Sequence, residues 1–377
     1  DFISDGQLGW TRMAEPFEKF VYPDFTFEVF GERERFRADL IERFPHERQG
    51  IERYLRDIER GLRFMGMRGV ARSASWPLRA ALEVVTRPFE RLALQTTATY
   101  LGRHISDPKL RALLVSQWGA YGLPPSKSAF GLHALLTRHY MNGGYYPTGG
   151  SGRLADTIIP VIEAAGGKVI TATEVTEILV RRGRAVGVET KNRRAELQTY
   201  HAPVIVSGVG AYNTYGKLLR PGDHSASVGP LLRLAEQAPT TMVAYLGFRD
   251  DPRKLGFAGE NHWISESYDH ERHSSGAELA EGRAEWCYLS FPSLKSGQTE
   301  AVHTAEIMAF VSRDSFERWS GSRWMKRGRD YGELKETIAA GLLALVERHY
   351  PGFRARVDFV VDVLRKLSGP DPAFLTG

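Results

Sequence analysis

The apolar positions of the first 142 residues change from an alternating to a helical pattern. The stretch KFVYPDFTFEVFG alternates aromatic and β-branched residues with polar ones, which predicts two strands divided by a turn at Pro23-Asp24. Apolar residues then recur at helical spacing on both sides of Pro45, which predicts two helices. The residues on these two faces are Phe36, Leu40, Ile41 and Phe44, followed by Ile51, Tyr54, Leu55, Ile58 and Leu62.

The next stretch, residues 63–92, mixes arginines with large apolar residues. A basic amphipathic stretch of this kind is typical of a helix that lies on a membrane surface. More often it is a helix that packs its apolar face into the protein. The sequence leaves both interpretations open for Met65, Met67, Trp76, Leu78, Leu82, Val85, Phe89 and Leu92.

The pattern then changes to short helices and strands. Residues 153–167 carry apolar side chains on one helical face and end in two glycines, which predicts a helix that Pro160 kinks or shortens. Strands are predicted in KVITATEVTEILVRRGRAVGVET, with a hairpin turn at Arg182-Gly183. The apolar run APVIVSGVG, residues 202–210, predicts a buried strand that ends at a ligand-facing loop.

Beyond Pro221 the chain predicts an antiparallel sheet. The candidate strands are TTMVAYLGF, EWCYLSFPS, AEIMAFVS and RVDFVVDVL, and a long helix is predicted in YGELKETIAAGLLALVERHY. A polar loop, residues 268–283, follows the first strand, and Cys287 in the second strand is expected to be buried. The sequence contains no internal repeat, and the predicted fold class is α/β (α+β).

Length and composition narrow the class of protein. A chain of 377 residues exceeds what one core usually fills, so two domains are expected. The net charge of +5 comes from dispersed basic residues and no nucleic-acid-binding motif is present, so nucleic acid is not an expected partner. No apolar run approaches the roughly 20 residues that span a bilayer. We therefore expect a cytoplasmic protein, with a membrane surface as a candidate partner.

Residues 150–155 match the G-x-G-x-x-A pattern of a dinucleotide-binding loop, and Glu174 lies near the distance of a ribose-binding carboxylate. A genuine loop of this kind follows a buried strand directly. Here the preceding residues are HYMNGGYYPT. Pro147 and the two glycines in this stretch argue against a central strand. We therefore interpret these glycines as a turn that caps a helix.

The same region resembles the middle segment of the flavin-dependent phytoene desaturase, carotenoid isomerase and retinol saturase family. Residues 145–188 contain the Tyr-Pro-x-Gly-Gly turn, the helix, the Gly-Gly pair, the strand ending in valine and the Gly-Val hairpin that mark this family. The resemblance continues in EPFEKFVYPDFTFEV, APVIVSGVGAYNTYGKLL and RGRDYGELKETIAAGLLALVERHYPGF. It therefore covers nearly the whole chain.

The resemblance implies part of a glutathione-reductase-type FAD domain, together with a substrate domain of helices and antiparallel sheet. The implied division is 1–142 for the first part of the substrate domain, 143–220 for the middle segment of the FAD domain, and 221–377 for the second part of the substrate domain. The family's G-x-G-x-x-G motif and its C-terminal flavin segment have no counterpart in these residues. We therefore expect an interior fragment that binds FAD poorly by itself.

The resemblance also implies FAD as the cofactor, NAD(P) as a candidate redox partner, and hydride transfer with a lipid-like polyene or isoprenoid substrate. The implied FAD contacts are Gly149 and Gly150 at the flavin, the main chain of Val175 at the adenine, and Ser207 and Gly208 along the nucleotide. Candidate substrate contacts are Tyr145, Tyr146 and His139, with Arg138 beside them. Packing within a turn is the alternative for these side chains, and no catalytic residue is identified.

Other chemistry has weaker support in the sequence. His270 and His273 in HERH have no evident third ligand, so an exposed loop is expected there and no metal site. Walker, G-x-S-x-G and H-E-x-x-H patterns are absent, which opposes the commonest NTPase, hydrolase and metalloprotease functions. The competing class is a non-enzymatic isoprenoid-binding protein with the architecture of the GDP-dissociation inhibitors, because fold alone does not define function.

Overall fold

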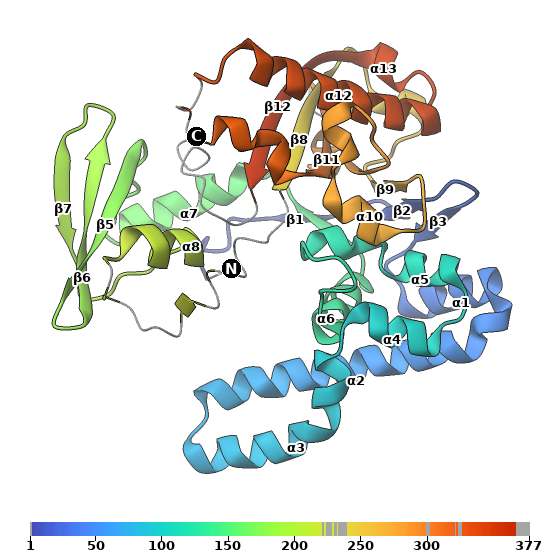
Figure 1. The fold of residues 1–377 in the computed structure, drawn as a ribbon, viewed down its shortest axis with the longest axis horizontal. Coiled ribbons are helices and arrows are strands. Elements are labelled where there is room, and N and C mark those ends of the chain that lie inside the picture. Colours follow the sequence, from blue (N-terminus) through green and yellow to red (C-terminus); the bar gives the residue numbers. More distant parts are fainter. Residues whose placement is uncertain are drawn as a thin grey trace.

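The computed structural model describes residues 2–220, 222–223, 228–229, 232, 240–298, 302–320, 322 and 326–366 (Figure 1). Within these residues the strands form a seven-stranded sheet, a three-stranded sheet and a two-stranded pair. Helices and strands are both abundant, so the predicted α/β (α+β) class is confirmed.

The large sheet has the strand order β12-β8-β11-β10-β9-β2-β3. All of its neighbouring strands pair antiparallel except β2 and β9, which are parallel. Because β2 and β3 come from the beginning of the chain and the other five strands from its later half, the sheet joins both flanks of the middle region. The strands span Glu18–Val21 (β2), Thr26–Val29 (β3), Thr240–Phe248 (β8), Asn261–Ser265 (β9), Trp286–Ser290 (β10), His303–Val311 (β11) and Val357–Lys366 (β12).

The helix α12 (Arg329–His349) packs against this sheet (Figure 1). Directly after the helix, the Tyr350 hydroxyl lies 2.6 Å from His262 Nδ1 on β9. Cys287 on β10 is fully buried, as predicted. The short elements of this half are η5 (Pro252–Leu255), α10 (His270–Ser275), η6 (Glu278–Glu281), α11 (Pro292–Lys295), η7 (Arg313–Trp319) and α13 (Phe353–Arg356).

A helical region lies on the other side of the sheet and has an aromatic centre. The rings of Tyr100 and Phe130 stack with centroids 3.8 Å apart, and the Tyr54 hydroxyl lies 2.8 Å from His133 Nε2. The apolar faces predicted on either side of Pro45 form helices, as expected. The elements are α1 (Arg33–Arg43), η1 (Pro45–Glu47), α2 (Arg48–Ser73), α3 (Trp76–Leu94), α4 (Thr97–His104), α5 (Pro108–Leu114), η2 (Ser116–Ala120) and α6 (Phe130–Tyr140).

The end of α2 and the whole of α3 form an arm that projects away from the rest of the molecule (Figure 1). Thr86 and Ala93 of α3 are buried. Other apolar side chains of α3 stay exposed, and Trp76 is 80% exposed. Inward packing therefore accounts for only part of the apolar face in residues 63–92. None of the helices in the described part of the chain is long and apolar enough to cross a membrane.

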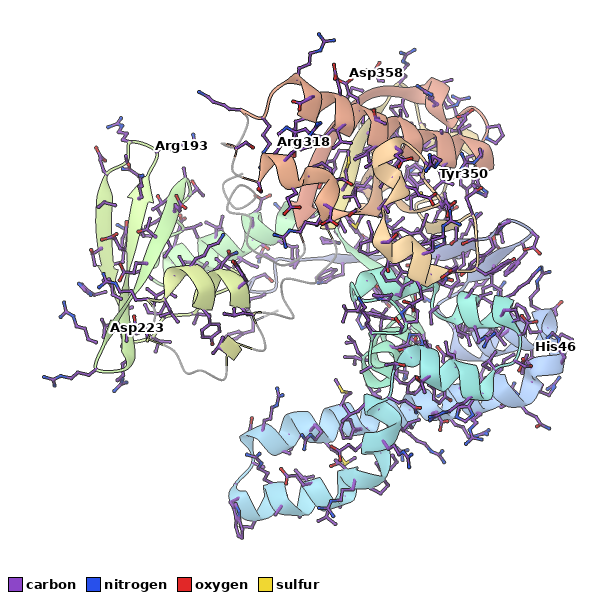
Figure 2. The ribbon with its side chains drawn as sticks, in the orientation of Figure 1. His46, Arg193, Asp223, Arg318, Tyr350 and Asp358 are labelled. Atoms are coloured by element: carbon purple, nitrogen blue, oxygen red, sulfur yellow. The ribbon has the colours of Figure 1, made fainter. Side chains whose placement is uncertain are left out.

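The three-stranded sheet of the middle region is separate from the large sheet, and Figure 2 labels Arg193 near its upper end and Asp223 near its lower end. The predicted hairpin is confirmed, because Arg182 and Gly183 have φ values of 52° and 73° and connect two antiparallel strands. Pro160 lies inside the helix α7. The elements are β1 (Trp10–Arg12), which pairs with β4 (Tyr145–Pro147), and then α7 (Arg153–Ala164), β5 (Thr173–Arg181), β6 (Arg184–Asn192), β7 (Leu197–His201), α8 (Ala211–Asn213) and η3 (Thr214–Leu218).

The predicted buried strand at residues 202–210 is wrong. These residues are irregular, and Val204 and Val206 are 72% and 89% exposed. Residues 168–172, also expected in a strand, are irregular as well. A buried strand needs a neighbour for its backbone hydrogen bonds, and neither run pairs with a strand in the described part of the chain. Their apolar side chains therefore lie on the surface.

Leu289→Ala should lower the free energy of unfolding by about 2–5 kcal/mol, because Leu289 is fully buried on β10 and its truncation leaves a cavity. The matched control is Leu197→Ala on β7, where the side chain is 63% exposed. That change should cost less than about 0.5 kcal/mol. Urea unfolding followed by circular dichroism measures both losses, and equal losses would contradict the assignment of the large sheet to the core.

Candidate functional site

The candidate site begins at the turn that follows β4. Pro147 pairs with Trp10 on β1, and the Gly149 N–H then donates to the Ser296 carbonyl oxygen at 2.8 Å. Gly149 and Gly150 have φ values of 83° and 92°, a backbone region that favours glycine. A Cβ on Gly150 would meet no atom within 4 Å. A Cβ on Gly149, by contrast, would lie 3.1 Å from Arg153 Cγ. Gly150 is therefore the position at which a flat ligand can approach bare main chain closely.

Two tyrosines lie on β4 just before this turn. Successive side chains of a strand point to opposite faces, so Tyr145 and Tyr146 face different ways. Lys295 Nζ lies 5.8 Å from the centroid of the Tyr146 ring. Burial raises the pKa of the Tyr146 phenol, a hydrogen bond with Ser151 opposes this rise, and the Glu306 carboxylate adds to it. Tyr146 therefore faces the large sheet, whereas Tyr145 is exposed.

One face of the large sheet is partly open. In the strand register Tyr245 lies opposite Glu306, and Met308 lies opposite Tyr288, so these four residues share a face. Each of them is partly exposed. The residues that point to the other face are fully buried, namely Ala244, Ile307 and Leu289. We call the four partly exposed residues, Tyr245, Glu306, Met308 and Tyr288, the open strip. The open strip forms the floor of the candidate site.

A buried polar cluster lies on the same face of the sheet. Glu18 and Lys295 are only 1% and 6% exposed. The Asn261 side-chain amide joins them, since its nitrogen donates to Glu18 Oε1 at 2.9 Å and its oxygen accepts from Lys295 Nζ. Trp263 Nε1 donates to Glu18 Oε2, and the Tyr288 hydroxyl donates to Asn261 Oδ1 at 2.8 Å. We call this the Glu18–Asn261–Lys295 cluster.

Burial brings the ionisation of both charged groups of this cluster close to neutral pH. It raises the pKa of Glu18 from 4.5 to about 7, against the hydrogen bonds from Asn261 and Trp263 and the charge of Lys295. It lowers the pKa of Lys295 from 10.5 to about 8, against the attraction of the Glu18 and Glu306 carboxylates. Groups with pKa values shifted in this way are concentrated at functional sites.

A second charged group lies on the opposite face of the same strands. Lys19 Nζ and His262 Nε2 lie 3.0 Å and 3.5 Å from Glu260 Oε1. Burial lowers the pKa of His262 to about 3, so its ring is neutral at pH 7. His262 contacts Tyr350 and the ring of Phe257 in the core. We therefore assign this group to packing.

The other predicted flavin contacts lie on the middle unit. Val175 is on β5 opposite Thr190, and its side chain is partly exposed. Ser207 and Gly208 lie in the exposed irregular run, where Ser207 Oγ is 2.7 Å from Thr214 Oγ1. Among the described residues no hydrogen bond joins these positions to the Gly149–Gly150 turn. Their contact with a flavin stays a prediction.

The predicted contacts at the end of α6 also stay predictions. His139 is exposed and contacts the ring of Tyr140, with centroids 5.3 Å apart. The adjacent Arg138 pairs with Glu59 at 3.2 Å. Neither side chain forms a hydrogen bond or an ion pair with the turn in the part of the chain that the structure describes.

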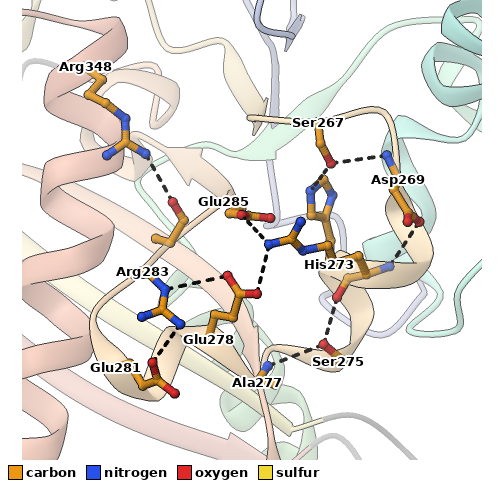
Figure 3. A network of polar contacts seen from close by, with 12 residues as sticks. Ser267, Asp269, His273, Ser275, Ala277, Glu278, Glu281, Arg283, Glu285 and Arg348 are labelled. Carbon is orange, nitrogen blue, oxygen red and sulfur yellow. Dashed lines mark hydrogen bonds and ion pairs between the residues drawn. The ribbon is translucent and has the colours of Figure 1, made fainter.

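The exposed loop expected around His270 and His273 is wrong, because both rings are buried. Trp118 Nε1 donates to His270 Nδ1 at 3.0 Å. His273 Nε2 lies 3.0 Å from Ser267 Oγ (Figure 3). Burial lowers the pKa of both histidines. Next to them, an Arg272 guanidinium nitrogen donates to both Glu278 and Glu285 (Figure 3). The described residues contain no group of three side chains placed to hold a metal ion.

Sequence reasoning missed the open strip and the Glu18–Asn261–Lys295 cluster. One signal was present, because Glu18 and Lys19 begin a strand that continues with apolar residues, and buried charges need partners. The strand β9, which carries Asn261, was not predicted. The partners of Glu18 could therefore not be predicted from the sequence.

No protein-family model matches this chain. Its fold is similar to that of an oxidoreductase from Methanosarcina mazei, with a TM-score of 0.57 at 14% identity over 98% of this chain and 73% of that structure. A putrescine oxidase mutant gives a TM-score of 0.52 at 12% identity over 96% of this chain and 70% of that structure. The chain therefore has the fold that these two oxidoreductases share.

Sequence comparison indicates which oxidoreductases and isomerases this chain resembles. The chain is 27% identical over 381 residues to the all-trans-retinol 13,14-reductase of Danio rerio and 29% identical over 384 residues to that of Homo sapiens, covering 96% of this chain and 62% of each relative. It is 25% identical over 369 residues to prolycopene isomerase 1 of an Oncidium hybrid cultivar, covering 93% of this chain and 57% of the relative. The chain thus spans less than two thirds of the length of each of these relatives. The predicted resemblance to the retinol saturase and carotenoid isomerase family is confirmed.

Replacing Glu18 should change how stability depends on pH. Folding favours the protonated acid, because the pKa of Glu18 is about 7 in the folded protein against an ordinary 4.5. The stability that this group contributes is fully present below pH 4.5 and is lost as the pH rises through about 7. Relative to Glu18→Gln, the free energy of unfolding of the wild type should therefore fall by about 1–3 kcal/mol between about pH 5 and pH 8.

Glu260→Gln is the matched control. Burial opposes the ionisation of Glu260, yet contact with His262 and the Lys19 ammonium keeps the pKa of its carboxyl below 4.5. Its contribution is present above that pH and is lost only in more acidic solution, so the same comparison should be flat from about pH 5 to pH 8. Urea unfolding at four pH values measures the free energy of unfolding of the wild type and of both variants. A flat result for Glu18→Gln would contradict the assigned ionisation.

Proposed function

We propose that this chain is part of an FAD-dependent oxidoreductase that acts on a hydrophobic polyene or isoprenoid by hydride transfer. Its relatives support this proposal, because they are named retinol 13,14-reductase and prolycopene isomerase. One observation in the structure carries it. The Gly149–Gly150 turn, whose main chain is open at Gly150, lies beside Tyr146 and Lys295 and next to the open strip, so a flat cofactor and an extended apolar substrate would meet there.

The residues of the middle unit fit a flavin nucleotide. Gly149 and Gly150 would lie against the flavin, the main chain of Val175 against the adenine, and Ser207 and Gly208 along the rest of the nucleotide. The fit rests on the empty space around a Cβ at Gly150 and on the exposure of Val175, Ser207 and Gly208. When bound, FAD would supply the hydride chemistry that side chains lack. The residues of this chain would bind it, orient it and exclude water.

The open strip and Tyr146 would bind the substrate. The rings of Tyr245 and Tyr288 and the flexible thioether of Met308 suit an apolar conjugated chain. Tyr145 and His139 are both exposed, so we place them at the outer edge of the substrate site. In this arrangement the substrate lies between the sheet and the cofactor, where proximity is the main requirement for hydride transfer.

A non-enzymatic isoprenoid-binding protein is the second candidate. One relative, 26% identical over 384 residues, is named an inactive all-trans-retinol 13,14-reductase of Danio rerio. Binding of an isoprenoid without flavin would favour this function. Saturable binding of FAD would favour the enzyme.

FAD should bind to the purified chain weakly but saturably, and Gly150→Ala should weaken this binding at least about tenfold. The added methyl group would occupy the space in which the main chain is proposed to meet the flavin, where no protein atom lies within 4 Å. Quenching of flavin fluorescence during a protein titration gives the dissociation constant. A wild-type chain that shows no saturable binding would contradict the flavin proposal.

Gly166→Ala is the matched control for this experiment. Gly166 has a φ of 80°, close to the 92° of Gly150, and a Cβ there would also meet no atom within 4 Å. Both alanines therefore carry a similar backbone strain, but Gly166 lies beyond the far end of α7. Gly166→Ala should leave the affinity for FAD unchanged. Equal weakening by both changes would assign the effect to strain.

We also propose that the arm contacts an anionic membrane surface. The large apolar side chains exposed on α3 are Trp76, Leu78, Val84, Val85 and Leu94. The exposed arginines of the same helix are Arg79, Arg87 and Arg91. Exposed apolar residues together with arginines suit the boundary between headgroups and acyl chains of an acidic lipid layer. A lipid-like substrate would enter the protein from such a surface.

Trp76→Gln should reduce co-sedimentation with vesicles of phosphatidylcholine and phosphatidylserine at least about threefold, because Trp76 is 80% exposed on the arm. Binding of the wild type should rise with the phosphatidylserine fraction and fall with added salt. The control is Trp10→Gln, which alters an exposed tryptophan of β1, away from the arm. Binding that ignores Trp76, lipid charge and salt would overturn the proposal.

A further inference from the structure

A carboxylate and an ammonium are buried together on the sheet face that borders the glycine turn. Removing two charges from water is costly, and well-packed apolar residues often stabilise a core equally well. The Glu18–Asn261–Lys295 cluster is nevertheless fully enclosed, and each charged member is held by hydrogen bonds. Packing alone does not require charges at this position.

The cluster is linked to the turn through the chain and through space. Lys295 ends α11, and the next residue, Ser296, accepts the hydrogen bond from the Gly149 N–H. Lys295 Nζ lies 5.8 Å from the centre of the Tyr146 ring, and the Tyr146 phenol is hydrogen-bonded to Ser151 just after the two glycines. A single aromatic ring therefore lies between the ammonium and the turn.

We propose that Glu18 and Lys295 form a buried charge couple whose ionisation sets the electrostatic potential at the Gly149–Gly150 turn and so the affinity of that turn for its ligand. This inference rests on the proposed function, in which that ligand is a flavin facing a polyene. The Tyr146 ring separates Lys295 Nζ from the turn, so no proton passes to the ligand and the charge of the couple acts on it through space. Glu18 supplies the counter-charge of Lys295 and is held by Asn261 and Trp263.

Other titratable groups face the couple from each neighbouring element. They are Tyr140 from α6, Tyr146 from β4, Tyr288 from β10, Glu306 from β11 and Glu260 before β9. Burial raises the pKa of each of these tyrosines further above 10, and the pKa of Glu260 lies below 4.5. The three tyrosines and Glu260 keep their charge between about pH 6 and pH 9, the range in which the couple changes charge.

A thiol introduced by Ser151→Cys tests whether the charge of the couple is felt at the turn. Ser151 is exposed and the native Cys287 is fully buried, so iodoacetamide will alkylate the new thiol selectively. Nearby positive charge lowers the pKa of a thiol and so alters its rate of alkylation. The rate–pH profile should therefore show a second inflection between about pH 6 and pH 9, in addition to the ionisation of the thiol itself.

That inflection should disappear when Glu18→Gln and Lys295→Met are added together to Ser151→Cys. Removing both charges leaves no unpaired ion in the sheet, so this variant should fold, as circular dichroism will verify. The matched control adds Asp57→Asn, which alters another buried carboxylate, in the helical region, and should keep the inflection. Identical profiles with and without the couple would overturn the proposal.

The affinity for FAD gives a second readout. It should change at least about fivefold between about pH 6 and pH 9 in the wild type and stay flat in Glu18→Gln/Lys295→Met, because ligand binding is linked to the ionisation of the couple. The same pH profile in both proteins would overturn the proposal. If neither protein binds FAD, the proposed function fails, whereas the alkylation result still decides whether the couple acts at the turn.

Discussion

A carboxylate and an ammonium that are buried together must be solvated by the protein itself, and the large sheet meets this requirement. The two oxygens of Glu18 accept from Asn261 and Trp263, which lie two residues apart on one face of β9. The parallel pairing of β2 with β9 sets Asn261 opposite Glu18. One side chain therefore secures the first strands of the chain to a sheet built mainly from its later half. A slip of one residue in this register would turn both donors to the wrong face.

The same arrangement gives the two faces of the sheet different roles. One face carries the packed group around His262 and is closed by Tyr350 at the end of α12. The other carries the polar cluster and the open strip, and it borders the turn at Gly149 and Gly150, where the main chain is open at Gly150. A rigid floor beside exposed main chain is a suitable place to position two ligands against each other. This is the arrangement from which an oxidoreductase function is inferred.

Local patterns were sufficient for features whose backbone hydrogen bonds close within a short stretch, such as the turns at Pro23-Asp24 and Arg182-Gly183. They failed where the partner is distant in sequence. Residues 202–210 have the composition of a buried strand, but composition does not supply the neighbouring strand that burial requires. The sequence around His270 predicts a loop, but in the structure Trp118, which is 152 residues away, donates a hydrogen bond to the His270 ring. The same holds for the candidate site. Its glycine turn closes within a few residues and could be predicted, whereas the partners of Glu18 lie on the distant strand β9 and could not.

The distance along the chain between β2 and β9 also has a consequence in time. Glu18 and Asn261 are 243 residues apart. A ribosome adds roughly 5–20 residues per second, so β2 is synthesised roughly 10 to 50 seconds before the strand that completes it. The helices between them have mostly local contacts and will fold during this interval. A nascent chain therefore passes through a long stage in which one strand edge and one carboxylate await their partners, and this is the stage at which a chaperone or a change in translation speed would have the largest effect on its fate.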